Sequence, residues 1–250
     1  EAAWQDLSEV IDTERLIPVT YVNSAASLKA FCGRHGGVVC TSSNASAVME
    51  WAFSRGDRVL FFPDQHLGRN TSLQMGITLD QMPVWDPFDD DLGGNNEQQL
   101  HDSRVILWKG HCSVHQMFTA EHVHQFRENY PDIKIMVHPE CCQEVNDLAD
   151  VSGSTGKIIE TVRNASAGTR WAIGTELHLV NRLKQEHPDQ EIHFLSSVVC
   201  MCATMYRIDQ AHLCWSLENL AAGTPVNVVQ VDDETSRWAL IALERMLAIN

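Results

Sequence analysis

One cysteine of the chain lies between two histidines at the end of an apolar run. Residues 105–118 read VILWKGHCSVHQMF, so Cys112 is flanked by His111 and His115. A cysteine in this setting can bind zinc, act as a nucleophile, bind an iron–sulfur cluster or remain a buried thiol. Zinc sites usually show paired ligands at short spacing. His111 and His115 are four residues apart, a spacing that suits one face of a helix, but Gly110 and the strand end place them at a turn. This segment alone therefore leaves the alternatives open.

A second cysteine motif, SSVVCMCATMYR, contains Cys200 and Cys202. If this segment is a strand, the two side chains point the same way, which fits either metal ligation or packing. Iron–sulfur clusters gather thiolates from one or more places in a chain. The motif by itself does not distinguish these uses.

The segment MVHPECC places His138 and Glu140 around Pro139 at the end of another apolar run. Their side chains could bind a carboxylate and transfer protons. A turn followed by an acidic residue at a helix N-terminus explains Glu140 equally well. Both interpretations stay open.

Two further segments, GSTG at 153–156 and CTSSNA at 40–45, each precede a helical pattern. Ser or Thr at such a place is an ordinary N-cap, and the same helix start can bind a phosphate or carboxylate. Two such segments in one chain slightly favour an anionic substrate. Tyr21 and Asn23 add a donor and acceptor pair at another strand end, with structural hydrogen bonding as the alternative.

Charge and composition restrict the class of protein. With 18 basic and 33 acidic residues, the formal net charge is 18 − 33 = −15, and no Lys/Arg cluster stands out. This argues against partners such as nucleic acids and anionic membranes. The first residues lack a signal-peptide pattern and no apolar run approaches about 20 residues, so we expect a cytoplasmic protein. The eight cysteines are then thiols, metal ligands or catalytic groups, not a disulfide framework.

Short apolar runs alternate with helix-length segments along the chain, which predicts βαβ units and parallel sheets, that is, an α/β fold. Polar residues come directly after each of these apolar runs. In open parallel sheets, ligands bind outside the carboxyl ends of the strands. We therefore expect these polar segments to converge on one site: YVN, TSSN, PDQH, KGHC, HPEC and GTE.

Taken together and in this order, eight blocks resemble the quinolinate synthase family, and they cover nearly the whole chain. They are YVNSAASLKA, CTSSNA, FFPDQHLGRN, GHCSVH, VHPEC, GSTG, GTELHLVNRL and CMCATMYR.

The resemblance implies pseudo-repeated three-layer αβα domains with parallel sheets around a central [4Fe–4S] cluster held by three cysteines. It implies a transferase that condenses iminosuccinate (iminoaspartate) with dihydroxyacetone phosphate, releasing quinolinate, phosphate and water in de novo NAD biosynthesis. The cluster would act as a Lewis acid. An L-aspartate oxidase would supply iminosuccinate.

The resemblance also implies roles for single residues. Cys112 and Cys202 match the second and third cluster ligands, with Cys200 as a bystander and the two histidines around Cys112 as neighbours, not ligands. His138, Pro139 and Glu140 match the family's binding and proton-transfer segment, and for the whole enzyme we expect Tyr21 and Glu140 to be the catalytic proton carriers. The residues that match substrate-binding positions are Tyr21, Val22, Asn23, Ser42, His138, Pro139, Glu140 and Thr155.

The family's first cluster cysteine precedes the Tyr-Val-Asn strand, whereas here only twenty residues precede Tyr21 and none is cysteine. We therefore expect a fragment that supplies two of the three thiolates. Its expected parts are a remnant of the N-terminal domain (1–17), a second α/β domain (18–108), a third (109–199) and a C-terminal segment with the last cluster cysteine (200–250). The alternatives are another iron–sulfur hydro-lyase or a non-catalytic cluster-binding fragment.

Overall fold

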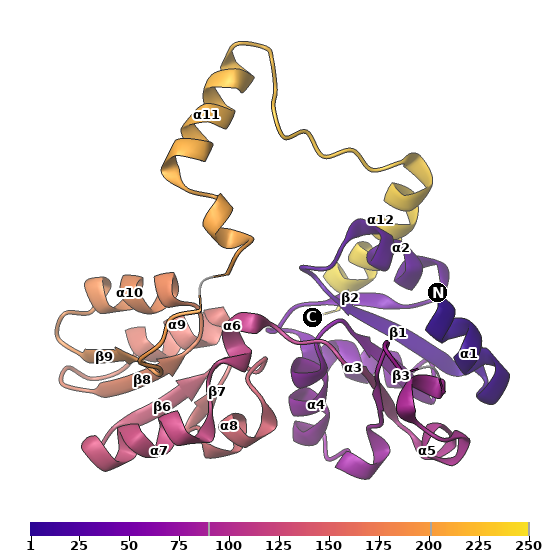
Figure 1. Ribbon diagram of the computed structural model, residues 1–250, viewed down its shortest axis with the longest axis horizontal. Coiled ribbons are helices and arrows are strands. Elements are labelled where there is room, and N and C mark those ends of the chain that lie inside the picture. The colour runs from indigo at the N-terminus through magenta and orange to yellow at the C-terminus, as the bar shows by residue number, and fades with distance from the viewer. Residues whose placement is uncertain (90, 201, 250) are drawn as a thin grey trace.

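The structure, a computed structural model, describes residues 1–89, 91–200 and 202–249. Two sheets lie side by side, and every strand pair in them is parallel, which confirms the predicted α/β class (Figure 1). The first sheet has the order β2-β1-β3-β5-β4 and the second β7-β6-β8-β9. Their strands are β1 (Leu16–Tyr21), β2 (Val38–Cys40), β3 (Arg58–Phe62), β4 (Val84–Trp85), β5 (Val105–Trp108), β6 (Lys134–Val137), β7 (Val151–Ser152), β8 (Arg170–Gly174) and β9 (Glu191–Phe194).

Helices connect most consecutive strands, as parallel pairing requires. They are α1 (Ala2–Val10), α2 (Ala26–Arg34), α3 (Ala45–Phe53), α4 (Gln65–Gln74), α5 (Glu97–Asp102), α6 (Ser113–Gln116), α7 (Ala120–Asn129), α8 (Gln143–Leu148), α9 (Thr155–Arg163), α10 (Leu177–Glu186), α11 (Gln210–Ala221) and α12 (Asp233–Leu247). Four short 3₁₀ turns complete the described elements: η1 (Thr13–Arg15), η2 (Leu79–Gln81), η3 (Leu92–Gly94) and η4 (Met205–Arg207).

The longer apolar runs became strands as predicted, but one local expectation was wrong. Cys200 and Cys202 lie in no strand, and Cys202 instead precedes η4. The period-two argument for their side chains therefore does not apply, and Met201 between them lies outside the described residues. The two-residue edge strands β4 and β7 are too short to give a readable alternation.

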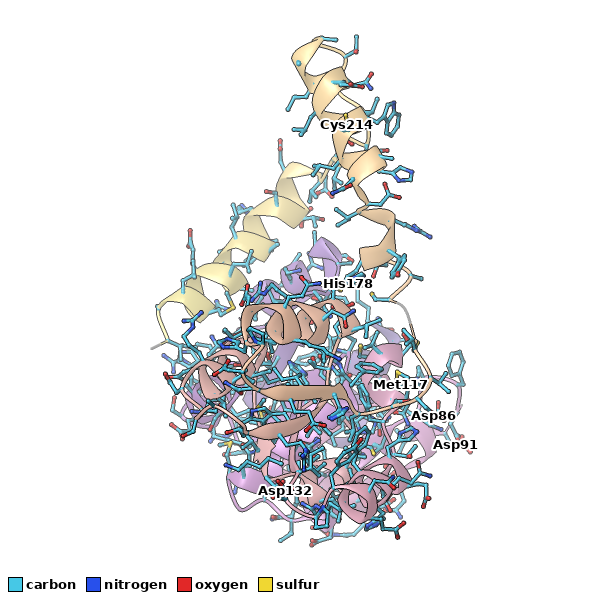
Figure 2. The ribbon with its side chains drawn as sticks, turned by 90° about the vertical axis from the view of Figure 1, so that its left-hand side faces the viewer. Asp86, Asp91, Met117, Asp132, His178 and Cys214 are labelled. Carbon is cyan, nitrogen blue, oxygen red and sulfur yellow. The ribbon has the colours of Figure 1, made fainter. Side chains whose placement is uncertain are left out.

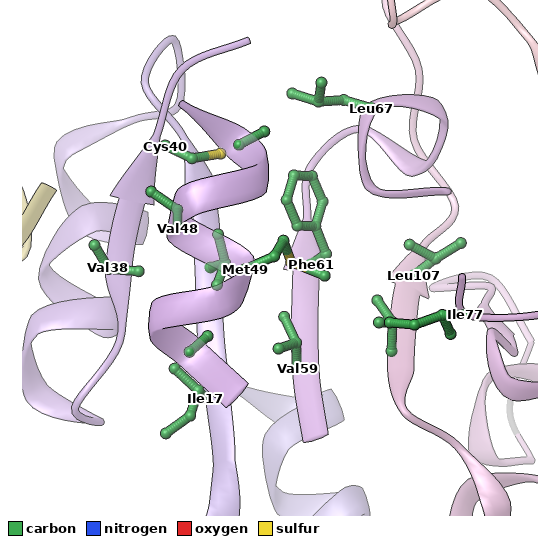
Figure 3. Packing of buried hydrophobic residues seen from close by; sticks show 14 of the residues in the cluster. Ile17, Val38, Cys40, Val48, Met49, Val59, Phe61, Leu67, Ile77 and Leu107 are labelled. Carbon is green, nitrogen blue, oxygen red and sulfur yellow. The ribbon is translucent and has the colours of Figure 1, made fainter. Parts of the chain in front are cut away.

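The core of the first sheet follows the two-residue period of its strands. In β3, Val59 and Phe61 point to one face, where they pack with Met49 of α3 and Leu67 of α4 (Figure 3). Leu60 and Phe62 point to the opposite face, towards α1, α2 and α12. Each fully buried side chain of this size contributes about 1.5–3 kcal/mol. Both faces of the sheet are thus covered, which gives the three-layer αβα arrangement.

The second sheet is built in the same way. Ile135 and Val137 of β6 pack towards α7 and α8, whereas Met136 between them packs towards α9 and α10. Strands buried on both faces read as continuous apolar runs, as they do in this sequence. The carboxyl ends of β5 and β6 are thereby fixed, and the polar segments that follow them are held close together.

The last helix returns to the first sheet. α12 packs along α2 and β2, while α11 stands away from both sheets and buries none of its residues (Figure 1). Cys214 lies exposed on α11 (Figure 2). Within the described ranges, no helix combines the length and the apolar composition that a membrane crossing requires. The domain boundaries at 17/18, 108/109 and 199/200 remain a prediction.

Gly33 permits the close contact between α2 and α12. A Cβ atom there would lie 2.0 Å from the carbonyl oxygen of Trp238, and the Arg245 guanidinium donates to the carbonyl of Gly37 at 2.7 Å in the same contact. We expect Gly33→Ala to lower the free energy of unfolding by about 1–3 kcal/mol, because backbone must move. Urea denaturation measures this change. Gly156→Ala is the matched helical control, because apart from its chain neighbours and its own helix backbone the nearest heavy atom to a Cβ there is Oγ of Ser154 at 3.9 Å. An equal loss in both variants would contradict the proposed contact.

Candidate functional site

The polar segments after β5 and β6 meet between the two sheets, where α6 lies in Figure 1. Cys112 is the residue before α6, His115 lies within it and Glu140 follows β6. The Sγ of Cys112, one ring nitrogen of His115 and one carboxylate oxygen of Glu140 all lie within 4.8 Å of one another. The convergence that was predicted from strand ends is therefore found for these segments.

Glu140 lies between two imidazoles in the protein interior. Its Oε2 is 3.3 Å from Nδ1 of His115 and 3.2 Å from Nδ1 of His138. The two rings stack with centroids 4.5 Å apart and an interplanar angle of 15°. All three side chains are at most 8 % exposed. A buried carboxylate at this place needs a nearby positive charge, because burial strongly disfavours an isolated ion.

The two histidines have opposite protonation preferences. Burial lowers the pKa of His115, but hydrogen bonding to Cys112 and Glu140 outweighs burial and raises the pKa to about 9. Burial and the neighbouring His115 cation lower the pKa of His138 to about 4. His138 is accordingly neutral, and its Nδ1 accepts the backbone N–H of Glu140 at 3.3 Å. For Glu140, burial raises the pKa, but the hydrogen bond from His115 and its charge prevail and lower it.

Asp64 links two segments of the site. One carboxylate oxygen accepts the N–H of Leu67 at 2.8 Å as the N-cap of α4, and the other accepts the N–H of Cys112 at 2.9 Å. The side chain is only 4 % exposed. Burial and the charge of Glu140 raise the pKa of Asp64 to about 6. This residue therefore fixes the backbone that carries the Cys112 thiol.

Asn70 on α4 joins the first sheet's layer to the segment after β6. Its Nδ2 donates to the carbonyls of Pro139 and Cys141, both at 2.8 Å, and the residue is 4 % exposed. These two carbonyls flank Glu140 in the chain. A single amide thus holds the backbone on both sides of the central carboxylate.

Tyr21 and Ser42 face this group from the ends of β1 and β2. Burial is the main cause that raises the pKa of Tyr21, and the charge of Glu140 adds to it, whereas interaction with the Ser42 hydroxyl opposes the rise. The phenol consequently keeps its proton at neutral pH. Val22 and Asn23, which follow Tyr21, are exposed.

A polar cavity of about 270 Å³ adjoins the site. It lies between the start of α3 and the start of α9, and Ser42, Thr71, Ser154 and Lys157 are among its lining residues. Ser154 caps α9 through the N–H of Lys157 at 3.3 Å, so capping is already satisfied there. Thr155 is exposed at the first position of α9. Helix starts, hydroxyl groups and an ammonium group around one cavity suit an anionic ligand.

The cysteines differ in burial: three are buried, Cys214 is exposed, and the other four, Cys112, Cys142, Cys200 and Cys202, are half-buried. Cys32, Cys40 and Cys141 are buried, and burial raises the pKa of each thiol. Cys112 and Cys202 are half-buried, and the Thr204 hydroxyl, 3.0 Å from Cys202 Sγ, lowers the pKa of the Cys202 thiol. Thiolate donors with access to the surface fit an iron–sulfur cluster, whereas thiols enclosed in apolar cores do not. Cys202 is not part of the compact group formed by Cys112, His115 and Glu140.

Sequence reasoning quoted Asp64 and Asn70 within its motifs without giving them a role, and it treated His115 only as a possible zinc ligand or as a neighbour of the cluster cysteine. His111 and His115 looked equivalent around Cys112, yet His111 is exposed and His115 is 7 % exposed. Their spacing to the cysteine could have separated them, because a residue three positions after an N-cap returns to the same helical side. No sequence signal shows that Asn70 reaches a segment almost seventy residues away.

We expect Asn70→Asp to destabilise the chain by about 2–4 kcal/mol. The change removes two hydrogen bonds and places a carboxylate against two carbonyls in a buried site near Glu140. Chemical denaturation at neutral pH measures the loss. Asn164→Asp at the exposed end of α9 is the matched control, with an expected change within about 0.5 kcal/mol. A loss below about 1 kcal/mol for Asn70→Asp would show that the amide does not hold this segment.

Comparisons with known proteins identify relatives over the whole chain. A family model described as Quinolinate synthetase A protein matches residues 2–248. A protein of Rhodopirellula baltica named quinolinate synthase is 75 % identical over 249 residues, which cover 100 % of this chain and 64 % of that protein.

Relatives of the same name come from other bacteria. The proteins of Corynebacterium glutamicum and a Nocardioides species are 51 % and 53 % identical, and the chain covers 63 % and 65 % of them. The chain thus spans a little under two thirds of the length of these curated relatives. On the family match and these identities, the chain belongs to the quinolinate synthetase A protein family.

Proposed function

We propose that this chain carries two α/β units of a quinolinate synthase, a transferase of de novo NAD biosynthesis. The reaction would condense iminosuccinate with dihydroxyacetone phosphate and release quinolinate, phosphate and water. Family membership supports this proposal, and one observation of the structure carries it: an ionised carboxylate, Glu140, is buried between two histidines beside Cys112. Such a group is suited to proton transfer in a site that excludes water.

Cys112 and Cys202 would hold a [4Fe–4S] cluster together with a thiolate that the described residues do not identify. When bound, the cluster supplies Lewis acidity towards a substrate oxygen. The partial exposure of both thiols is compatible with this role, but Cys142 and Cys200 are half-buried as well, so the assignment of Cys112 and Cys202 rests on the resemblance to the family. Cys200 is proposed as a bystander.

Glu140 and Tyr21 are proposed as the proton carriers. His115 keeps the Glu140 carboxylate ionised, so Glu140 can accept a proton during enolisation and imine formation. The raised pKa of Tyr21 keeps its phenol protonated, so it can donate a proton or a hydrogen bond to a developing oxyanion. Neutral His138 can orient the substrate through the ring nitrogen that does not face Glu140.

The polar cavity is proposed as the seat of the anionic groups of the substrates. Ser42 and the backbone N–H groups at the start of α9, beginning at Thr155, would bind a carboxylate or phosphate. Pro139 shapes the cavity wall, and Val22 and Asn23 are proposed contacts at the end of β1. An L-aspartate oxidase is proposed as the source of iminosuccinate.

Iron and acid-labile sulfide per chain test the cluster ligands after anaerobic reconstitution. In the full-length relative from Rhodopirellula baltica, we expect the substitutions that match Cys112→Ser and Cys202→Ser each to lose more than about half of the iron and sulfide that the unsubstituted protein binds, because each removes a thiolate. Cys200→Ser and Cys214→Ser are matched controls on cysteines without a proposed role. Loss in Cys200→Ser with retention in Cys202→Ser would reverse the assignment.

Turnover tests the role of Glu140. In the full-length relative from Rhodopirellula baltica, the substitution that matches Glu140→Gln should lower kcat by about 10²–10⁴-fold, since the amide cannot accept a proton. Quinolinate formation from the two substrates is the measurement. The substitution that matches Glu144→Gln, an exposed residue of α8, should leave kcat unchanged. Unchanged turnover after loss of the Glu140 carboxylate would refute the acid–base assignment.

A further inference from the structure

His115 has a buried nitrogen whose hydrogen-bonding capacity is not met. Its Nδ1 forms an ion-pair contact with Oε2 of Glu140 at 3.3 Å, but no hydrogen bond of good geometry reaches this atom among the described residues. The side chain is 8 % exposed, and one ring nitrogen of His115 belongs to the group that also contains the Sγ of Cys112. A buried ring nitrogen that lacks a well-aligned hydrogen bond leaves room for a stronger interaction, such as a bond to a cation.

We propose that Cys112, His115 and Glu140 form a site for a single divalent cation of the zinc class, available whenever no cluster occupies Cys112. We assign the ligand atoms as Sγ of Cys112, Nδ1 of His115 and Oε2 of Glu140, because these ring and carboxylate atoms face each other whereas Nε2 of His115 faces Thr175. Thiolate, imidazole and carboxylate are the three kinds of side chain that bind zinc in proteins.

The spacing of the donors fits one metal ion. Zinc lies about 2.0–2.2 Å from nitrogen and oxygen ligands, so two such ligands at a tetrahedral angle are about 3.4 Å apart. The distance between Nδ1 of His115 and Oε2 of Glu140 is 3.3 Å. The Cys112 sulfur, whose bond to zinc is longer, lies within 4.8 Å of one ring nitrogen of His115 and one carboxylate oxygen of Glu140. A cation can therefore be bound with side-chain adjustment alone.

The surroundings of the ligands support the same site. Nε2 of His115 lies 3.3 Å from Oγ1 of Thr175, so the second ring nitrogen can donate to this hydroxyl while Nδ1 binds metal. Metal-binding histidines usually have such an outer partner, which fixes the tautomer and the ring orientation. The Asp64 carboxylate accepts the backbone N–H of Cys112 and so fixes the position of this second ligand.

Charge and coordination number are consistent with an open site. A thiolate and a carboxylate together balance the two positive charges of the cation. This neutralisation lowers the free-energy cost of burying the cation away from water. His138 does not serve as a fourth ligand through Nδ1, because that atom accepts the N–H of Glu140. Three protein ligands leave a fourth position for water or a small anion, as in catalytic zinc sites.

The proposal does not depend on the quinolinate synthase assignment. The single cation and an iron–sulfur cluster would both use Cys112, so they exclude each other. Binding of the cation can be measured without iron, sulfide or substrates. Failure of the cluster experiment above would leave this site unaffected, and failure of the experiment below would leave the cluster assignment unaffected.

Cobalt(II) is the probe, titrated anaerobically into the reduced 250-residue chain while visible and near-ultraviolet absorption is recorded. We expect one cobalt ion per chain, with the intense visible bands of tetrahedral coordination and a sulfur-to-cobalt charge-transfer band. Zinc(II) should displace the cobalt, because zinc binds such donor sets more tightly. Cys112→Ser should abolish the charge-transfer band.

Variants of the two histidines around Cys112 form a matched pair. His115→Gln should weaken cobalt binding by at least about tenfold, whereas His111→Gln on the exposed neighbour should not change it. Thr175→Val keeps all three ligands and should weaken binding about 10–100-fold through loss of the outer hydrogen bond. Cys202→Ser should have no effect, since this thiol lies outside the group.

Several results would overturn the proposal. These are the absence of tetrahedral cobalt bands, a charge-transfer band that survives Cys112→Ser, equal effects of the two histidine variants, or loss of binding in Cys202→Ser. Circular dichroism of each variant confirms that it is folded. If His115→Gln does not fold, unchanged cobalt affinity in Thr175→Val refutes the assignment of His115 as a ligand.

Discussion

The structure depends on the burial of one carboxylate. Glu140 lies at the contact of the two α/β units, where water cannot solvate its charge, and the imidazolium of His115 at 3.3 Å compensates it. Removing either partner would leave an uncompensated ion in the interior, which costs several kcal/mol. The sheets and their connections must therefore bring these two side chains into direct contact.

α4 provides much of this accuracy through polar side chains rather than apolar packing. Asp64 at its start holds the N–H of Cys112, and Asn70 in its middle holds the carbonyls on both sides of Glu140. Directional hydrogen bonds fix position better than apolar contacts, which tolerate sliding, and buried ones are costly to break. One helix of the first unit thus positions the segments that follow strands of both sheets.

The sequence predicted the alternating strands and helices, but it did not predict the contacts between residues that lie far apart in the chain. Val59, Leu60, Phe61 and Phe62 form a continuous apolar run, which indicates a strand covered on both faces, and this strand is observed. The rule for strand ends also identified Cys112 and Glu140. The partner of each buried charge depends on how the segments that follow strands of the two sheets meet, and no local pattern encodes that. The return of α12 onto α2 at Gly33 was missed for the same reason.

The cluster of ionisable groups is difficult to explain by stability alone. Apolar residues of similar volume at the positions of Glu140, His115 and His138 would avoid the desolvation of a charge, and such replacements are often neutral or stabilising. The two rings are instead stacked and held in different protonation states, with an accessible thiol next to them. Groups whose pKa values are driven apart within one buried site are typical of acid–base chemistry. In the same arrangement the contact between Nδ1 of His115 and Glu140 lacks good hydrogen-bond geometry, and a cation bound between these two groups and the Cys112 thiol would satisfy both.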